Sequence, residues 1–267
     1  MSETGAPRRT ALVTGASSGF GVEFTRLFGA EGWDVVMVAR SGAAMETVAQ
    51  EVEERDRVEV TVLPRDLSAA GASAELVASL DQRGVVVEAL VNNAGFSTYG
   101  EFWRDDPATQ SELLRVNVVA LTELSRLIVP GMIERRRGRV LNLGSVGSFA
   151  PAPMTAAYAA TKAYVLSLSL AMAEELRDTG VTVTCLCPGP TATGFQGRAD
   201  MAESALIRDR GLPSAREVAE AGFLAMKAGK PYLVTGGSSR VFVFGSRFLP
   251  RTTAARIAGR SQRRVED

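Results

Sequence analysis

Residues 11–21 read ALVTGASSGFG, a short apolar run followed by a turn with glycines at positions 15, 19 and 21. The run Ala11–Thr14 predicts a buried strand, and large apolar residues then recur at helical spacing. Glycines let a backbone turn tightly and approach a phosphate, and the N-terminus of the following helix offers free N–H groups. The segment therefore predicts a dinucleotide-binding turn; a glycine-rich turn without a ligand is the alternative. The residues expected to bind are Gly15, Ser17, Ser18, Gly19, Phe20 and Gly21.

Short apolar runs alternate with helical patterns as far as about Val234. The later strands are expected at Val35–Val38, Val58–Leu63, Ala89–Val91, Val140–Leu143, Val181–Cys187 and Tyr232–Val234. The helices are expected at Ala43–Glu54, from about Pro107 to Glu134, at Tyr158–Arg177, and after a Ser214–Glu217 capping box. The strand runs are continuously apolar, which is typical of a parallel sheet covered on both faces. We expect an α/β fold: one doubly wound parallel sheet (a Rossmann fold) in three layers, forming a single domain over residues 1–267.

The end of the second expected strand distinguishes NAD from NADP. A carboxylate there would bind the adenosine ribose hydroxyls and repel a 2′-phosphate. The residues are Val38-Ala39-Arg40-Ser41, with no acid. The guanidinium of Arg40 can pair with a phosphate, and Ser41 can add a hydroxyl donor. The alternative is a solvated arginine at a helix start, but the missing acid favours NADP in either case.

Two further segments follow the third and fourth strands. Asp66, followed by Leu67, is suited to hold the adenine amino group; the alternative, which is compatible with that role, is a helix N-cap before residues 68–80. The run Asn92-Asn93-Ala94-Gly95 lies where open α/β sheets bind ligands. The amide of Asn93 can tie neighbouring loops together, while the small Ala94 and Gly95 leave room for a cofactor. A purely structural turn is an alternative for Asn92.

Tyr158 and Lys162 lie four residues apart and so share one helix face. A free tyrosine has a pKa of about 10, and a neighbouring cation lowers the pKa of a phenol. We therefore expect Tyr158 to be a general acid whose pKa Lys162 lowers. Ser145 follows the fifth strand, where its hydroxyl can hold a substrate oxygen. A chance Tyr-x-x-x-Lys pair and a turn serine between two glycines are the alternatives.

These residues together closely resemble the short-chain dehydrogenase/reductase family, from Thr10 to about Val234. The matching elements are Thr14-Gly15-x-x-x-Gly19-x-Gly21, Asn92-Asn93-Ala94-Gly95, Asn117, Ser145, Tyr158-x-x-x-Lys162 and Pro188-Gly189. The resemblance implies a Rossmann fold, a nicotinamide cofactor and no metal. It implies a catalytic tetrad of Asn117, Ser145, Tyr158 and Lys162. In it Asn117 holds a water that links Lys162 to solvent, and the Ala39-Arg40 pattern is similar to NADP-preferring members.

The same resemblance places a loop over the nicotinamide. This loop is Pro188-Gly189-Pro190-Thr191-Ala192-Thr193, in which Thr191 or Thr193 reaches the carboxamide or the phosphates. The segment Gly194–Leu212 is the expected substrate lid. The apolar residues of this segment indicate an apolar substrate pocket, together with Phe96, Phe149, Pro151, Pro153 and Met154. The alternative is that several of these residues belong to the core. We expect an NADPH-dependent oxidoreductase for a hydrophobic carbonyl or its alcohol. The alternatives are a non-catalytic NADP-binding regulatory protein and an NAD-dependent alcohol dehydrogenase on the same scaffold.

Composition narrows the function classes. The chain has no His, which excludes Ser-His-Asp and Cys-His mechanisms and the commonest zinc ligand. Lys+Arg and Asp+Glu number 30 each, so the overall charge does not favour nucleic acid. The run Arg135–Arg137 fits a helix C-terminus that Gly138 ends. Cys185 and Cys187 share one strand face as buried thiols, which suits a reducing cytoplasm.

The sequence also carries signals about surfaces. The polar segment Met1–Thr10 lacks the apolar core of a signal peptide, and no uninterrupted run has the ~18 apolar residues of a membrane span. The helix Tyr158–Arg177 is apolar on more than one face, which predicts a homodimer or homotetramer. The tail Ser239–Asp267 has seven Arg against two acids, a net charge of +5. Its apolar first half packs on the pocket or on a partner subunit, or else the tail contacts a membrane surface.

Overall fold

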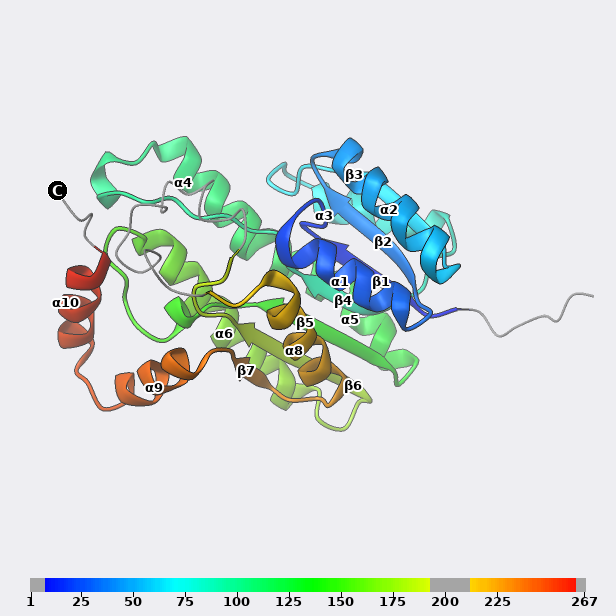
Figure 1. Ribbon diagram of the computed structural model, residues 1–267. Coiled ribbons are helices and arrows are strands. Elements are labelled where there is room, and N and C mark those ends of the chain that lie inside the picture. Colours follow the sequence, from blue (N-terminus) through cyan, green and yellow to red (C-terminus); the bar gives the residue numbers. More distant parts are fainter. Residues whose placement is uncertain (1–7, 193–211, 263–267) are drawn as a thin grey trace, which may run out of the picture.

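The structure is a computed structural model that describes residues 8–192 and 212–262. Its centre is a parallel sheet of seven strands in the order β3-β2-β1-β4-β5-β6-β7 (Figure 1). The strands are β1 Thr10–Thr14, β2 Asp34–Ala39, β3 Val60–Pro64, β4 Val87–Asn92, β5 Gly138–Leu143, β6 Val181–Cys187 and β7 Tyr232–Val234. This order confirms the doubly wound Rossmann sheet that the alternating pattern predicts.

Helices cover both faces of the sheet (Figure 1). One face carries α1 Gly19–Ala30, α2 Gly42–Asp56 and α8 Ala215–Lys227. The other carries α3 Ala72–Gln82, α5 Leu121–Glu134 and α6 Ala156–Glu175. Successive residues of one strand enter different cores: Leu12 packs in the core beneath α3 and α5, and Val13 in the core beneath α1 and α8. Both faces of each strand are therefore apolar, which explains the uninterrupted apolar runs in the sequence.

Local capping signals in the sequence correspond to real helix starts. The Ser214 hydroxyl accepts a hydrogen bond from the Glu217 N–H at 3.2 Å, and the Glu217 carboxylate accepts one from the Ser214 N–H at 2.7 Å. This is the predicted capping box, and α8 begins directly after it. The carboxylate of Asp106 likewise accepts from the Thr109 N–H at 2.9 Å and caps α4, Pro107–Leu114.

The helix predicted from Pro107 to Glu134 is present and has three parts. Between α4 and α5 lies one π-helical stretch, η2, Arg115–Ala120. The whole helix of 28 residues is long and apolar enough to cross a membrane by composition alone. Its inner side instead packs on the sheet, with Leu124 and Met132 fully buried, as in the core helix of an α/β domain.

The run Arg135–Arg137 follows a helix C-terminus, as expected, but Gly138 does not end that helix. Helix α5 ends at Glu134, and Gly138 is the first residue of β5. Arg135 and Arg136 donate hydrogen bonds to the carbonyls of Val87 and Asp178, at 3.2 and 3.1 Å. Arg137 forms an ion pair with Glu88 at 2.5 Å. All three guanidiniums therefore tie the ends of neighbouring elements together.

The C-terminal tail forms two helices, α9 Gly237–Ser246 and α10 Arg251–Gln262, separated at Pro250. Val243 of α9 is buried in a core cluster with Val165 of α6 and the two cysteines of β6. Cys185 and Cys187 lie on one face of that strand, as expected, with their Sγ atoms 3.7 Å apart as free thiols. Helix α9 therefore packs beside β6 and α6.

Candidate active site

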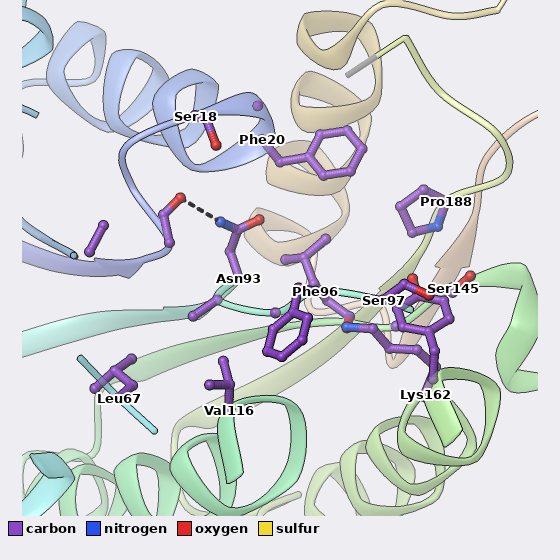
Figure 2. A pocket seen from close by; sticks show the side chains of 18 of the residues that line it. Ser18, Phe20, Leu67, Asn93, Phe96, Ser97, Val116, Ser145, Lys162 and Pro188 are labelled. Atoms are coloured by element: carbon purple, nitrogen blue, oxygen red, sulfur yellow. Dashed lines mark hydrogen bonds between the residues drawn. The ribbon is translucent and has the colours of Figure 1, made fainter. Parts of the chain in front are cut away.

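A cavity of about 460 Å³ lies at the carboxyl ends of the strands. It includes the point where the sheet order reverses between β1 and β4, the usual ligand position in such folds. Among the described residues, those predicted for the catalytic tetrad and for the cofactor line it, apart from Gly21 and Asn117. Figure 2 shows Ser18 and Phe20 at one end of the cavity and Ser145 and Lys162 together at the other.

The glycine turn approaches its neighbours too closely for larger residues. Gly15 and Gly19 have φ of +65° and +56°, in the left-handed region that favours glycine. A Cβ on Gly15 would lie 2.8 Å from Nδ2 of Asn93. Gly21 was expected to contact the cofactor, but it packs beneath the turn: a Cβ there would lie 2.3 Å from the Gly15 carbonyl oxygen. Gly21 thus allows α1 to start close to β1 without lining the cavity.

The Asn-Asn-Ala-Gly segment connects β4 to this turn. The amide of Asn93 donates to the carbonyls of Thr14 and Gly15, at 2.9 and 3.1 Å. The Thr14 hydroxyl accepts from the backbone N–H groups of Asn93 and Ala94, both at 3.0 Å. The predicted linking role of Asn93 is therefore present, and Ala94 and Gly95 line the cavity.

Asn92 has the structural role that the sequence left open. It is buried, and its amide donates to Oδ1 of Asn142 at 2.9 Å and to the Ser125 hydroxyl at 3.1 Å. Asn142 on β5 in turn donates to the Ser169 hydroxyl on α6 at 2.9 Å. A buried polar network therefore joins β4, β5 and the two helices above them.

Two arginines line the end of the cavity beside β2 and β3. Arg40 and Arg65 both line it, and the Arg65 N–H donates to the Ala39 carbonyl at 2.9 Å. The Arg65 side chain pairs with Glu75 at 2.7 Å, while its buried Nε has no partner in the described part of the chain. Sequence reasoning missed Arg65, although its place next to the predicted Asp66 was a usable signal.

Arg40 also has a neighbour that the sequence did not indicate. Its guanidinium pairs with Glu112 of α4 at 3.1 Å, and the Arg40 side chain is 70% exposed. Such an exposed ion pair contributes little and exchanges readily for another anion. Glu112 is 72 residues away along the chain, and no local pattern connects the two.

Asp66 lines the cavity but does not cap a helix. Its Oδ1 accepts hydrogen bonds from the N–H and the hydroxyl of Ser68, at 2.9 and 2.8 Å. These bonds, and then the charge of Arg40, hold the pKa of the Asp66 carboxyl below its usual value. Helix α3 begins only at Ala72, after Gly71, so the helix-cap alternative is wrong. Asp66 is therefore an ionised acceptor at the rim of the site, with Leu67 beside it.

The reaction end of the cavity brings Ser145, Tyr158 and Lys162 together. Ser145 follows β5 and opens a short 3₁₀ turn, where its hydroxyl accepts from the Gly147 N–H at 3.1 Å. Tyr158 and Lys162 lie on the first turns of α6. Nζ of Lys162 donates to the Leu143 carbonyl at 2.6 Å and lies 5.6 Å from the Tyr158 ring centre.

Burial controls the electrostatics at this end. It raises the pKa of Tyr158 to about 12, although the hydrogen bond with Ser145 acts in the opposite direction. The expected lowering of the Tyr158 pKa by Lys162 is not seen, because the cost of desolvating a phenolate dominates. Burial also lowers the pKa of Lys162 to about 8, so the amine still carries a proton at neutral pH.

Asn117 lies in the π-helical stretch η2 and is almost fully buried. Its Oδ1 accepts from the Phe96 N–H at 3.1 Å, and its Nδ2 donates to the Phe96 carbonyl at 3.0 Å. Nδ2 also donates to the Thr161 hydroxyl at 3.2 Å, and that hydroxyl donates to the Tyr158 carbonyl at 2.7 Å. Asn117 does not line the cavity; it connects the Phe96 loop to the helix that carries Tyr158. Sequence reasoning did not find Thr161.

The loop after β6 closes one side of the cavity. Pro188, Gly189, Pro190 and Thr191 line it, and the Pro188 carbonyl accepts from the Val146 N–H at 2.9 Å. Thr191 donates to the Gly189 carbonyl at 2.9 Å. Thr193 and residues 194–211 of the expected lid lie outside the described residues.

The expected apolar pocket is only partly present among the described residues. Phe96 lines the cavity. Ala152 and Thr155, which neighbour the expected pocket residues Pro153 and Met154 in the sequence, also line it. Phe149 instead packs on the ring of Tyr232, with centroids 6.4 Å apart. The prolines at 151 and 153 and Met154 do not line the cavity. Phe96 therefore fits the predicted pocket, whereas Phe149 fits the alternative of a residue packed in the core.

Sequence comparison gives a consistent result. The family profile described as short chain dehydrogenase matches residues 9–204. The very-long-chain 3-oxoacyl-CoA reductase of Bos taurus is 33% identical over 187 residues, which are 68% of this chain and 59% of that protein. The enzyme of the same name from Laccaria bicolor is 36% identical over 175 residues, 65% of this chain and 52% of that protein. The chain therefore aligns with little more than half the length of these curated relatives.

Solved structures match most of the chain. A short-chain dehydrogenase from Sphingobium yanoikuyae in complex with NADPH has a TM-score of 0.80 and 28% identity, with 90% of this chain and 93% of that chain covered. The bulky-bulky ketone specific alcohol dehydrogenase of Comamonas testosteroni has a TM-score of 0.77 and 26% identity, with 91% and 93% covered.

Proposed function

This chain belongs to the short-chain dehydrogenase family, and on that premise we propose that it reduces a carbonyl group of a hydrophobic substrate with NADPH, or runs the reverse alcohol oxidation. One observation carries the proposal. Ser145, Tyr158 and Lys162 line the same cavity as the glycine turn and Arg40. A proton donor and the proposed nucleotide-binding turn therefore share one cavity.

The lining of the cavity supports the proposal that the cofactor is a nicotinamide dinucleotide phosphate. The turn presents backbone at Gly15, where a side chain would collide with Asn93, and at Gly19, whose φ of +56° favours glycine; such close backbone suits a pyrophosphate. Arg40 and Arg65 place two cations beside the end of β2, where an NAD-binding site would have a carboxylate. The unpartnered Nε of Arg65 supports an anionic ligand at this end. Ser17, Ser18, Ser41 and Asp66 complete the adenosine side of the proposed contacts.

NADPH, when bound, supplies a hydride to the carbonyl carbon. The protein must then deliver a proton to the carbonyl oxygen, and Tyr158 is the donor with the right position and protonation. Its raised pKa keeps the phenol protonated at neutral pH, ready to donate. The Ser145 hydroxyl holds the same oxygen and stabilises the charge that develops on it.

Lys162 supplies the positive charge that the reaction needs. As an oxygen on the substrate gains negative charge, the ammonium favours proton transfer from the phenol. Its bond to the Leu143 carbonyl fixes the amine beneath Tyr158. Asn117 and Thr161 hold the backbone of the same helix at Tyr158, so Asn117 is a positioning residue in this scheme.

The substrate is proposed to be an apolar ketone. Phe20, Phe96 and Val116 contribute apolar surface to the cavity (Figure 2). Relatives of the chain carry names that specify very-long-chain 3-oxoacyl-CoA and bulky ketones. A 3-oxoacyl thioester or a bulky ketone is therefore the first class to test.

Activity is tested by following NADPH absorbance with 3-oxoacyl thioesters of increasing chain length and with bulky aryl ketones. We expect turnover that rises with apolar size and is slower with NADH. The absence of turnover across the panel, in a protein that binds NADPH, would favour the non-catalytic alternative. A lower KM for NADH than for NADPH would favour the NAD-dependent one.

The exposed apolar face of α5 and α6 supports our proposal of a homo-oligomer. Leu127, Tyr164 and Leu170 are each about two-fifths exposed there, amid charges of both signs such as Glu123 and Arg126. Mixed charge suits a self-complementary contact between two copies. Light scattering should show a dimer or tetramer, and Leu127→Arg should shift it towards monomer. A strict monomer at micromolar concentration would contradict the proposal.

A reducing cytoplasm is our proposal for the location. The two free thiols of β6, only 3.7 Å apart, support it.

A further inference from the structure

Helices α9 and α10 carry large apolar side chains on the surface of the molecule. Val241, Phe244 and Phe248 are 74%, 64% and 74% exposed. They recur at i, i+3 and i+7, which places them on one side of α9 and of the turn that follows it. Val243 points the opposite way into the core. The helix is thus anchored by one apolar side chain and presents a second apolar stripe outward.

The apolar stripe is organised rather than scattered. The rings of Phe244 and Phe248 meet edge to face with centroids 5.4 Å apart. Phe242 and Leu249 are also exposed, as is Ile257 of α10. Exposed large apolar side chains gathered on one short segment mark an interaction site.

The segment that carries these apolar side chains has charges of a single sign. The segment from Gly237 to Gln262 contains five arginines and no Asp or Glu. Arg240 and Arg247 donate to the Val234 carbonyl and the Tyr232 hydroxyl, at 3.0 and 3.2 Å. The three exposed arginines of α10 have no acidic partner in the described part of the chain: Arg251, Arg256 and Arg260.

The charge indicates which occupant this surface fits. A second copy packed symmetrically on it would bring like charges together, which is unfavourable. Exposed aromatic side chains that are followed along the chain by exposed arginines match the boundary between anionic headgroups and acyl chains. We propose that α9 and α10 form a docking surface for an anionic lipid bilayer.

Contacts of the two helices place this surface beside the cavity. A Cβ on Gly189, in the loop after β6, would lie 2.2 Å from the Ser239 hydroxyl oxygen of α9. A Cβ on Gly259 of α10 would lie 3.2 Å from Pro153. The segment that follows Pro153 contributes Thr155 to the cavity wall. Docking therefore brings the loops around the cavity close to the bilayer surface.

Co-sedimentation of the full chain with vesicles tests the proposal without any need for turnover. Vesicles of phosphatidylcholine alone are compared with equal parts of phosphatidylcholine and phosphatidylglycerol, at low and at high salt. We expect binding to the anionic vesicles that weakens at high salt, because screening reduces the attraction of exposed charges. The triple variant Arg251→Gln, Arg256→Gln, Arg260→Gln should lose about fivefold per arginine in partitioning. The double variant Phe244→Ser, Phe248→Ser should lose about tenfold per ring.

Matched controls separate this surface from general stickiness. Leu224→Ser removes an exposed leucine from α8, and the triple variant Arg83→Gln, Arg177→Gln, Arg216→Gln removes equal charge elsewhere. Both controls should bind as the parent does, and all variants should keep the parent circular dichroism. The proposal is overturned if the parent stays in the supernatant with anionic vesicles at low salt, or binds neutral vesicles equally well. It is also overturned if either test variant binds like the parent, or if the Phe variant instead abolishes a lipid-free oligomer.

Discussion

The two ends of the cavity differ in the groups that line them and in how far those groups are exposed to solvent. The adenosine end consists of tight glycine backbone and partly exposed charges, among which Arg40 is paired with Glu112. The reaction end consists of polar side chains enclosed in the domain, with Lys162 only 6% exposed. Solvent weakens each contact at the first end, while burial strengthens each one at the second. We therefore expect losses at the reaction end to be large and losses at the adenosine end to be graded.

The largest effect is expected from Tyr158→Phe. The ring is kept and only the proton donor is removed, so kcat should fall by about 10²–10⁴. NADPH binding, measured by calorimetry, should stay close to that of the parent. A variant with near-normal kcat would place the general acid elsewhere and break the contrast between the two ends.

The next effect concerns the protonation of Lys162. Its pKa is lowered to about 8, so the ammonium is present below that pH and is lost above it. The kcat/KM for carbonyl reduction should therefore be level below pH 8 and fall as the pH rises through it. In Lys162→Arg the charge persists at high pH. Any activity that remains in this variant should show no such fall in kcat/KM above pH 8. If the variant keeps the pH profile of the parent, the fall reports the titration of another group.

A smaller effect is expected from Arg40→Ala. The loss of one charge-assisted contact to a 2′-phosphate should weaken NADPH binding about 10- to 100-fold. NADH has no such phosphate, and its affinity should hardly change. Arg65→Met should show the same selectivity if both cations face the phosphate. Equal losses for the two cofactors would show that the arginines support the fold rather than recognise the ligand.

The smallest effect is expected from Glu112→Gln. The exposed pair with Arg40 is worth about 0.2–1 kcal/mol. Its removal frees the guanidinium, so NADPH affinity should rise by no more than about fivefold. A large loss of affinity would instead give Glu112 a direct role in the site.

The same contrast explains which parts could be predicted from sequence. Contacts within a motif, such as the turn at Gly15 and the capping box at Ser214, follow from neighbours along the chain. Arg40 was identifiable because strand ends meet at one sheet edge. Glu112 was not, since only the packing of α4 over that edge brings it to Arg40.

The reaction end shows a different limit. Tyr158 and Lys162 are recognisable by spacing, but their pKa shifts come from burial, which a motif does not encode. Asn117 was found through the family resemblance, while its π-helical backbone and its partner Thr161 depend on tertiary packing. Gly21 was assigned to the cofactor because a motif does not separate ligand contact from close helix packing.

The hydrogen-bonded asparagines at the centre of the sheet have a consequence for the alignment of the two ends. Strands β1 to β4 carry the adenosine end, and β5 with α6 carries the reaction end. Asn92 and Asn142 are paired directly across the seam between β4 and β5, and Asn142 reaches Ser169 on α6. A slip of the strands by one residue would leave these buried amides unbonded, at a cost of about 1–3 kcal/mol for each group. These hydrogen bonds therefore fix the register of β5 against β4, and with it the distance between Tyr158 and the glycine turn.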